Sequence, residues 1–130
     1  MASEPLLEPG MALERIAAWQ EDLGRLATRT RAMSDRLGAL RITASDPQRL
    51  VELTIDTQGA LTDIRFGPGA TRHGADTLAR AVLATLGDAR RQAADRTRRI
   101  ILESIGPDSA AAREMLSRTA ERLGETGVPR

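Results

Sequence analysis

The stretch VELTIDTQGALTDIRF, residues 51–66, alternates apolar and polar side chains on both sides of a short polar segment. A period of two is typical of β-strands with one buried face. The apolar face of the first half consists of Val51, Leu53 and Ile55. Gly59 lies in the segment between the halves and supplies a positive φ if the turn needs one. The stretch predicts a β-hairpin whose strands cover residues 50–57 and 61–66.

The residues before this hairpin predict one more strand. Residues 40–44 also alternate, and Asp46-Pro47 after them forces a turn. Three short strands joined by tight turns form an antiparallel meander. We expect this meander to bury one face.

A long amphipathic helix precedes the strands. Apolar side chains recur at alternating spacings of three and four, which is a heptad seam typical of coiled coils. The seam contains Ile16, Trp19, Leu23, Leu26, Thr30, Met33, Leu37 and Leu40. The predicted helix runs over residues 11–37 and is ~40 Å long at ~1.5 Å per residue. That length exceeds what a domain of this size covers with its own chain, so the seam implies a partner helix.

Two further helices follow the strands. Residues 67–74 form a loop rich in glycine, which matches neither GxGxxG nor the P-loop pattern. Helical spacing predicts a second long helix over 76–104, ended by Gly106-Pro107, and a short helix over 110–123 capped by Asp108 or Ser109. The fold class is therefore α+β: long helix, three-stranded antiparallel sheet, long helix, short C-terminal helix. We divide the chain into a flexible leader (1–10), a dimerising domain (11–106) and a C-terminal helix with its tail (107–130).

The composition excludes most enzyme classes. The chain has 130 residues, 41% of them hydrophobic, no Cys, and His73 as its one histidine. Thiolate metal sites, Cys nucleophiles and multi-histidine metal centres are thus excluded. We expect no catalytic residue, cofactor, metal or small-molecule substrate. The sequence lacks a basic leader and a long apolar run, so we expect a cytoplasmic protein without a membrane partner.

All 19 basic residues are Arg, in a chain of net charge +1. Residues 25–41 hold five Arg against one Asp, and residues 90–99 have the same balance. Arg is suited to phosphate contacts, and two such strips predict weak, salt-sensitive binding of nucleic acid. Two other interpretations stay open: charged helix faces are often only solvated, and a GC-rich genome encodes Arg and Ala by default.

The order of these elements, together with the hairpin at 51–64 and the Ala-rich segment LARAVLATLGDARRQAADRT, resembles the YbaB/EbfC family of bacterial nucleoid-associated proteins. The resemblance covers roughly residues 12–104. It implies a homodimer whose sheets associate and whose long helices project as arms that grip double-stranded DNA with little base preference. It also implies a place in the nucleoid and no catalytic activity.

The resemblance assigns residues to both interfaces. It implies that the DNA contacts are Arg25, Arg29, Arg31, Arg36, Arg90, Arg91, Arg98 and Arg99. Taken with the seam, it implies a dimer interface of Ile16, Trp19, Leu23, Leu26, Met33, Val51, Leu53 and Ile55.

The resemblance leaves a second function open. The short helix near 109–123 extends beyond the family core, and the loop opens with Gly67-Pro68 where family members have Asp-Pro. The alternative is a dimeric adapter or assembly factor, for example in a specialised secretion locus, whose arms bind a protein partner with weak or no DNA binding.

Overall fold

The computed structural model describes residues 9–124. Its elements are α1 (Pro9–Ala39), β1 (Ile42–Ser45), β2 (Val51–Ile55), β3 (Leu61–Phe66), a 3-10 turn (Ala70–Arg72), α2 (Ala75–Ile105), α3 (Ala110–Thr119) and a π turn (Ala120–Gly124). This is the α+β order that the sequence predicts. Most boundaries differ from the predicted ones by one or two residues, as expected for helix and strand ends.

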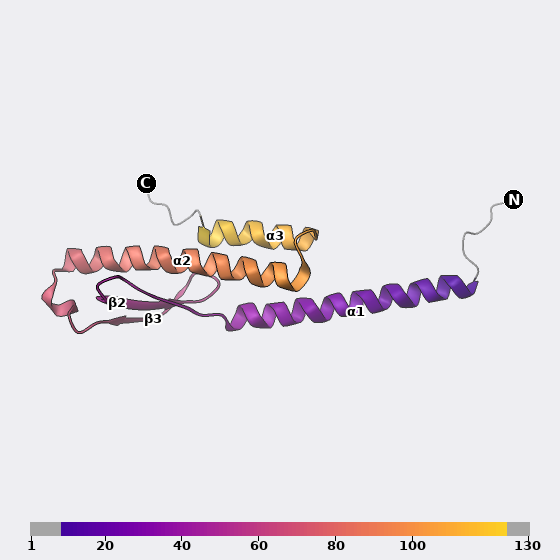
Figure 1. Ribbon diagram of the computed structural model, residues 1–130, viewed down its shortest axis with the longest axis horizontal. Coiled ribbons are helices and arrows are strands. Elements are labelled where there is room, and N and C mark those ends of the chain that lie inside the picture. Colours follow the sequence, from indigo (N-terminus) through magenta and orange to yellow (C-terminus); the bar gives the residue numbers. More distant parts are fainter. Residues whose placement is uncertain (1–8, 125–130) are drawn as a thin grey trace.

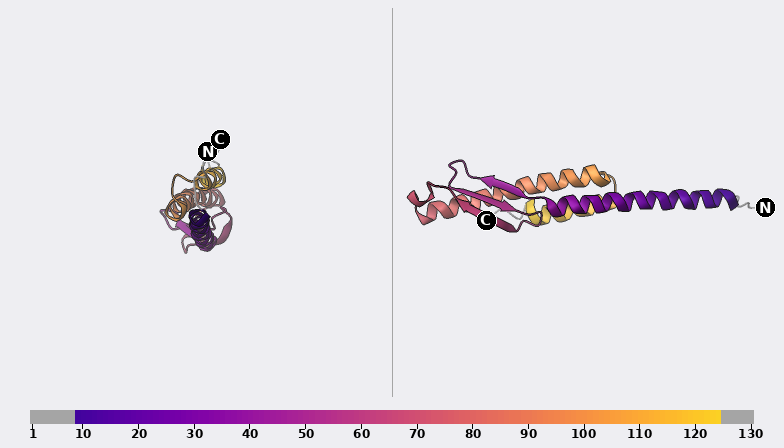
Figure 2. Two further views of the ribbon diagram at one scale, coloured as in Figure 1. Left: turned by 90° about the vertical axis from the view of Figure 1, so that its right-hand side faces the viewer. Right: turned by 90° about the horizontal axis from the view of Figure 1, so that it is seen from below.

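The molecule is elongated, and α1 projects from one end of it (Figure 1). The second long helix, α2, covers the small sheet, and α3 turns back along α2. Only the C-terminal part of α1 runs beside α2, while the N-terminal part extends beyond both other helices (Figure 2). None of the described helices is long and apolar enough to cross a membrane.

The sheet is antiparallel in the order β1-β2-β3. In its register Leu53 stands opposite Ile64, and Val51 stands opposite Phe66. Because α2 packs mainly on β1 and β2, all six residues of β3 stay exposed, including Ile64 and Phe66. The prediction of one buried face is therefore confirmed for β1 and β2 but wrong for β3, which lies outside the footprint of α2.

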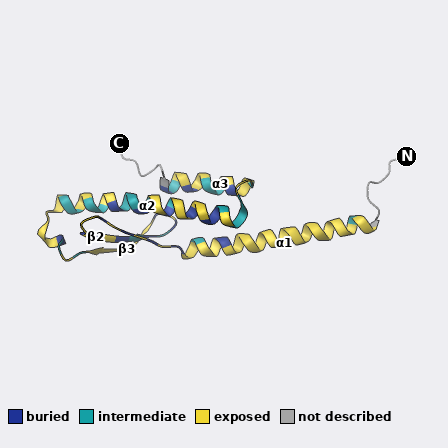
Figure 3. Ribbon diagram, in the orientation of Figure 1, coloured by how far each residue is buried: buried dark blue, intermediate teal, exposed yellow. Residues whose placement is uncertain are grey.

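The core lies between α2 and the first two strands. Ala89 and Ala93 of α2 are fully buried, and their small side chains let the helix approach the sheet closely. Around them pack the larger side chains of the core, which are Met33, Leu40, Ile42, Leu53, Ile55, Ile100, Ile101 and Leu123. Met33 is the first buried side chain of α1, so the part of α1 before it contributes nothing to this core (Figure 3).

The start of α1 corrects one prediction. The sequence predicts Pro9 and Gly10 in a leader that precedes the helix, but both belong to α1. Proline is tolerated in the first turn of a helix, because its missing N–H would have no intrahelical partner there. The rest of the predicted leader and of the predicted tail lies outside the described residues.

The junction between α2 and α3 is well defined locally. Gly106 follows α2 with a φ of 82°, which favours glycine. The Ser109 hydroxyl then accepts a hydrogen bond of 2.9 Å from the backbone N–H of Ala112 and caps α3. Of the two predicted caps, Asp108 and Ser109, the structure selects Ser109.

Candidate nucleic-acid interface

The predicted basic residues of α1 lie on its exposed surface. Arg29 and Arg31 are exposed, and neither forms an ion pair with a described residue. Arg25 pairs with Asp22 and lies 4.0 Å from Glu21. Exposed pairs of this kind contribute at most about 1 kcal/mol each, so a phosphate group can displace them at small cost.

The basic residues of α2 are more closely paired with acidic neighbours. Arg91 lies 3.5 Å from Asp88, and Arg98 lies 3.4 Å from Asp95, one turn away in each case. Arg99 is exposed and forms no ion pair with a described residue. The strip on α2 is therefore positive mainly at Arg99 and partly neutralised at Arg91 and Arg98.

Arg36 forms an ion pair between the two long helices. Its Nη2 donates a hydrogen bond of 3.3 Å to Oε1 of Glu103, near the C-terminal end of α2. Both side chains are about half exposed. This ion pair occupies Arg36 and places it where α1 leaves the body of the molecule.

Arg90 differs from the other predicted contacts because it is half-buried. Its Nε is buried and has no hydrogen-bond partner. The same Nε lies 3.7 Å from where a Cβ on Gly59 would stand, and Leu123 packs against the same glycine. The end of the α3 segment and the β2–β3 turn therefore cover part of Arg90.

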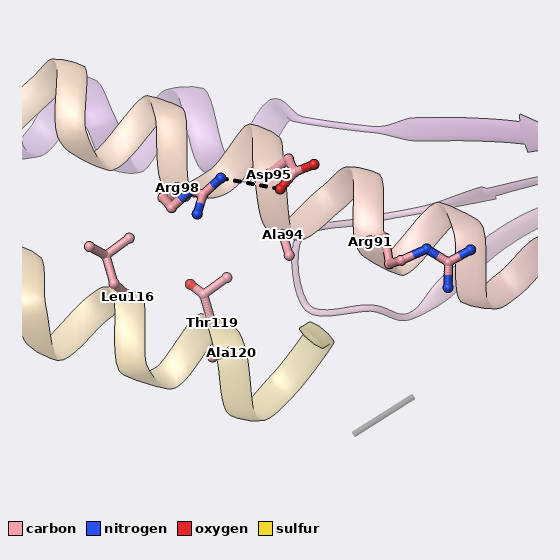
Figure 4. Close-up of a pocket in the computed structure, with 7 residues that line it drawn as sticks. All are labelled: Arg91, Ala94, Asp95, Arg98, Leu116, Thr119 and Ala120. Atoms are coloured by element: carbon pink, nitrogen blue, oxygen red, sulfur yellow. Dashed lines mark hydrogen bonds and ion pairs between the residues drawn. The ribbon is translucent and has the colours of Figure 1, made fainter. Parts of the chain in front are cut away.

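A groove of about 480 Å³ runs between α2 and α3 (Figure 4). Arg91 and Arg98 line it from α2, on the two sides of Ala94. Leu116 and Thr119 line it from α3. The groove thus combines apolar side chains with two guanidinium groups and the Asp95 carboxylate, and two predicted DNA contacts border it while staying exposed.

The predicted dimer residues fall into two groups. Four of them lie on the projecting part of α1 and are exposed: Ile16, Trp19, Leu23 and Leu26. The side chain of Trp19 is 62% exposed. The other four are at most 1% exposed in the core of the single chain: Met33, Val51, Leu53 and Ile55. Only the first group presents apolar surface to a second molecule.

The acidic residues and the histidine show no constellation for catalysis in the described part of the chain. His73 is exposed at the turn before α2. No group of three or more His, Asp or Glu among the described residues could hold a metal ion. Arg65 pairs with Asp63 at 3.0 Å on the exposed polar side of β3, as expected for a solvated sheet face.

Sequence reasoning missed two features of this surface. The first is the groove, which arises because α3 turns back along α2 at Gly106. The second is the partial burial of Arg90, which depends on the position of Leu123. The apolar spacing of residues 110–123 indicates that α3 packs on something, but periodicity does not specify the surface that receives it.

Comparison with known families agrees with the predicted resemblance. Residues 13–106 match the YbaB/EbfC DNA-binding family, so the match covers α1, the sheet and α2 and ends before α3. The chain belongs to this family of nucleoid-associated DNA-binding proteins, which is not a family of enzymes. No curated protein matches the chain.

Proposed function

We propose that the protein is a homodimer that binds double-stranded DNA with little base preference, through arginines on α1 and α2. Membership of a DNA-binding family carries the proposal. The proposed place of action is the cytoplasmic nucleoid. The proposed contacts are Arg25, Arg29, Arg31, Arg36, Arg91, Arg98 and Arg99, together with Arg90 if the α3 segment moves.

The projecting arm supports both parts of this proposal. The arm exposes an apolar seam on one side, and Arg29 and Arg31 are among its other exposed residues. A second copy packed along the seam would double the basic strips and hold them at a set separation.

The DNA part is tested by fluorescence anisotropy with a duplex of about 30 base pairs at low and near-physiological salt. The double variant Arg29→Glu with Arg31→Glu should bind at least about tenfold more weakly than the parent chain and show a shallower salt dependence. Both side chains are exposed, so thermal stability should be unchanged.

The matched control changes charge equally at two other exposed positions, Arg72→Glu with Arg113→Glu. Neither residue is a proposed contact. If the two double variants lose affinity equally, the effect is one of net charge, and the assignment to α1 is wrong. If the parent chain does not bind the duplex even at low salt, DNA binding itself is refuted.

A protein partner is the second candidate function, and the groove between α2 and α3 favours it. Its α3 wall lies outside the family match. In this alternative the family fold is kept while DNA binding is weak or lost. It predicts a dimer without DNA affinity at near-physiological salt, and a specific partner whose binding is lost in Arg91→Glu with Arg98→Glu.

A further inference from the structure

A cavity of about 160 Å³ lies where the end of α1, the β2–β3 turn, α2 and α3 meet. At about 30 Å³ for each water molecule, it has room for about five waters or one small ion. Because α3 forms one of its walls, the cavity is not part of the fold shared with the matched family region. Thr119 lines both this cavity and the larger groove bordered by Arg91 and Arg98, and the other residues that line the two differ.

Six of the nine described residues that line the cavity carry hydrogen-bond donors in their side chains, and the other three are apolar. The β2–β3 turn contributes Thr57 and Gln58, and α2 contributes Thr97. Two guanidinium groups complete the lining, that of Arg118 from α3 and that of Arg122 from the π turn that follows it. None of the described residues that line the cavity is acidic. A set of donors and cations without a carboxylate is suited to an anion that accepts hydrogen bonds from several directions.

A buried hydroxyl in this cavity points to an occupant. Thr97 is 2% exposed, and its Oγ1 has no hydrogen-bond partner. A buried polar group without a partner costs about 1–3 kcal/mol, so such groups are normally satisfied by protein, water or ligand. The neighbouring hydroxyl of Thr119 is already used, because it donates to the Met115 carbonyl at 2.9 Å. The Thr97 hydroxyl is therefore available to a molecule in the cavity.

The positive charge near the cavity is only partly compensated. The Nε of Arg118 donates a hydrogen bond of 3.1 Å to Oε2 of Glu114. The two terminal amino groups of this guanidinium remain for other acceptors. Arg90 does not line the cavity but lies against the same β2–β3 turn at Gly59, and it forms no ion pair with a described residue. A single anion in the cavity would lie near the β2–β3 turn, α2 and α3 together.

We propose that this cavity binds one phosphate group, either as inorganic phosphate or as a small phosphate monoester, and thereby ties α3 to the β2–β3 turn. The volume admits one phosphate but no nucleic-acid duplex. The site is therefore distinct from the proposed DNA contacts and does not depend on them.

The test titrates the full-length protein with inorganic phosphate by calorimetry, with chloride used to keep the ionic strength constant. Thr97→Val removes the orphaned hydroxyl with little change of shape, and Arg118→Gln removes one cation. Each change should weaken phosphate binding at least about tenfold, the effect of losing one hydrogen bond to a charged group. A parallel titration with glycerol 2-phosphate separates the two sources: tighter binding of the ester assigns a monoester, and weaker binding assigns the free ion.

Two variants provide matched controls. Thr85→Val removes another buried hydroxyl that has no partner but does not line the cavity. Arg113→Gln removes an exposed cation of α3 outside it. Both should bind phosphate as the parent chain does. Equal weakening in all four variants, or no binding by the parent chain, overturns the proposal and leaves a cavity filled by water.

Discussion

At the scale of single residues, Gly67 is the most constrained position after the hairpin. Its backbone N–H donates to the Leu50 carbonyl at 2.9 Å, which brings it against the chain at Arg49. A Cβ at Gly67 would overlap the Arg49 carbonyl oxygen. Arg49 has a φ of 61°, so the turn that carries this carbonyl is itself in an unusual conformation.

Gly67→Ala should therefore destabilise the protein by about 2 kcal/mol or more, because backbone must shift to admit the methyl group. Thermal or urea unfolding measures the effect. Gly69→Ala is the control, since nothing lies within 4 Å of a Cβ there and its φ of −84° suits any residue. Equal stability of the two variants would contradict the close approach at Gly67.

Asp46 makes the β1–β2 turn sensitive to acid. Its carboxylate accepts hydrogen bonds from the backbone N–H groups of Val51, at 2.8 Å, and Gln48, at 3.2 Å. Burial raises the pKa of Asp46, but these backbone hydrogen bonds outweigh it and hold the pKa below the ordinary value of 3.8.

A carboxylate with a lowered pKa stabilises the folded state above its unfolded pKa and loses this contribution as pH falls through its folded pKa. Asp46→Asn should thus be less stable than the parent chain at neutral pH, with the difference shrinking below pH 3.8. Unfolding midpoints measured from pH 7 to pH 2.5 check this. A difference that stays constant over that range would contradict the role of the charge.

At the scale of elements, α3 depends on a few apolar contacts. Leu123, in the π turn that follows α3, is fully buried against the β2–β3 turn, and Ala112 is fully buried in the first turn of α3. The Ser109 cap fixes where α3 begins, but only this packing fixes where it lies. A helix of ten residues is marginal by itself in water, so α3 should form only when docked.

Leu123→Ala should cost about 2–3 kcal/mol and release α3 before the rest of the molecule unfolds. Hydrogen exchange should show faster exchange in residues 110–124 with little change in the sheet. Leu83→Ala is the matched control, because Leu83 is 69% exposed and its truncation removes no packing. Unchanged protection of α3 in Leu123→Ala would refute this account of its docking.

At the scale of the whole molecule, the exposed seam predicts self-association. Trp19 is the one tryptophan of the chain and lies on this seam, so its fluorescence reports directly on the proposed contact. In a dimer its emission should be shifted to the blue, and it should return to the red on dilution. Light scattering should give a mass of twice 14.0 kDa.

The variant Leu23→Glu should dissociate the dimer, because it places a charge in the centre of the seam. Leu83→Glu adds the same charge on an exposed position of α2 and should leave the mass unchanged. A monomer in the parent chain, or a dimer that survives Leu23→Glu, would refute the seam as the interface.

Much of this molecule can be predicted from its sequence. The periodicity of two predicts β1, β2 and β3, and helical spacing predicts three helices. Both patterns arise because one face of each element contacts the core and the other contacts water, so apolar residues recur with the period of that element. The family is also recognisable from the hairpin and the Ala-rich helix. The predicted arginines of the arm are exposed as expected, because their position off the apolar seam is a local property of one helix.

Only the tertiary structure decided which apolar residues are buried in the core and which remain exposed. Met33 and Leu26 occupy the same seam, yet the first is buried and the second is 42% exposed. The apolar residues of β3 follow the same alternation as those of β2 but lie beyond α2. Arg90 lies half-buried and Arg99 lies exposed, although both belong to one basic strip. The reason is physical: periodicity specifies the face on which a side chain lies, whereas burial depends on how far the neighbouring element extends over that face.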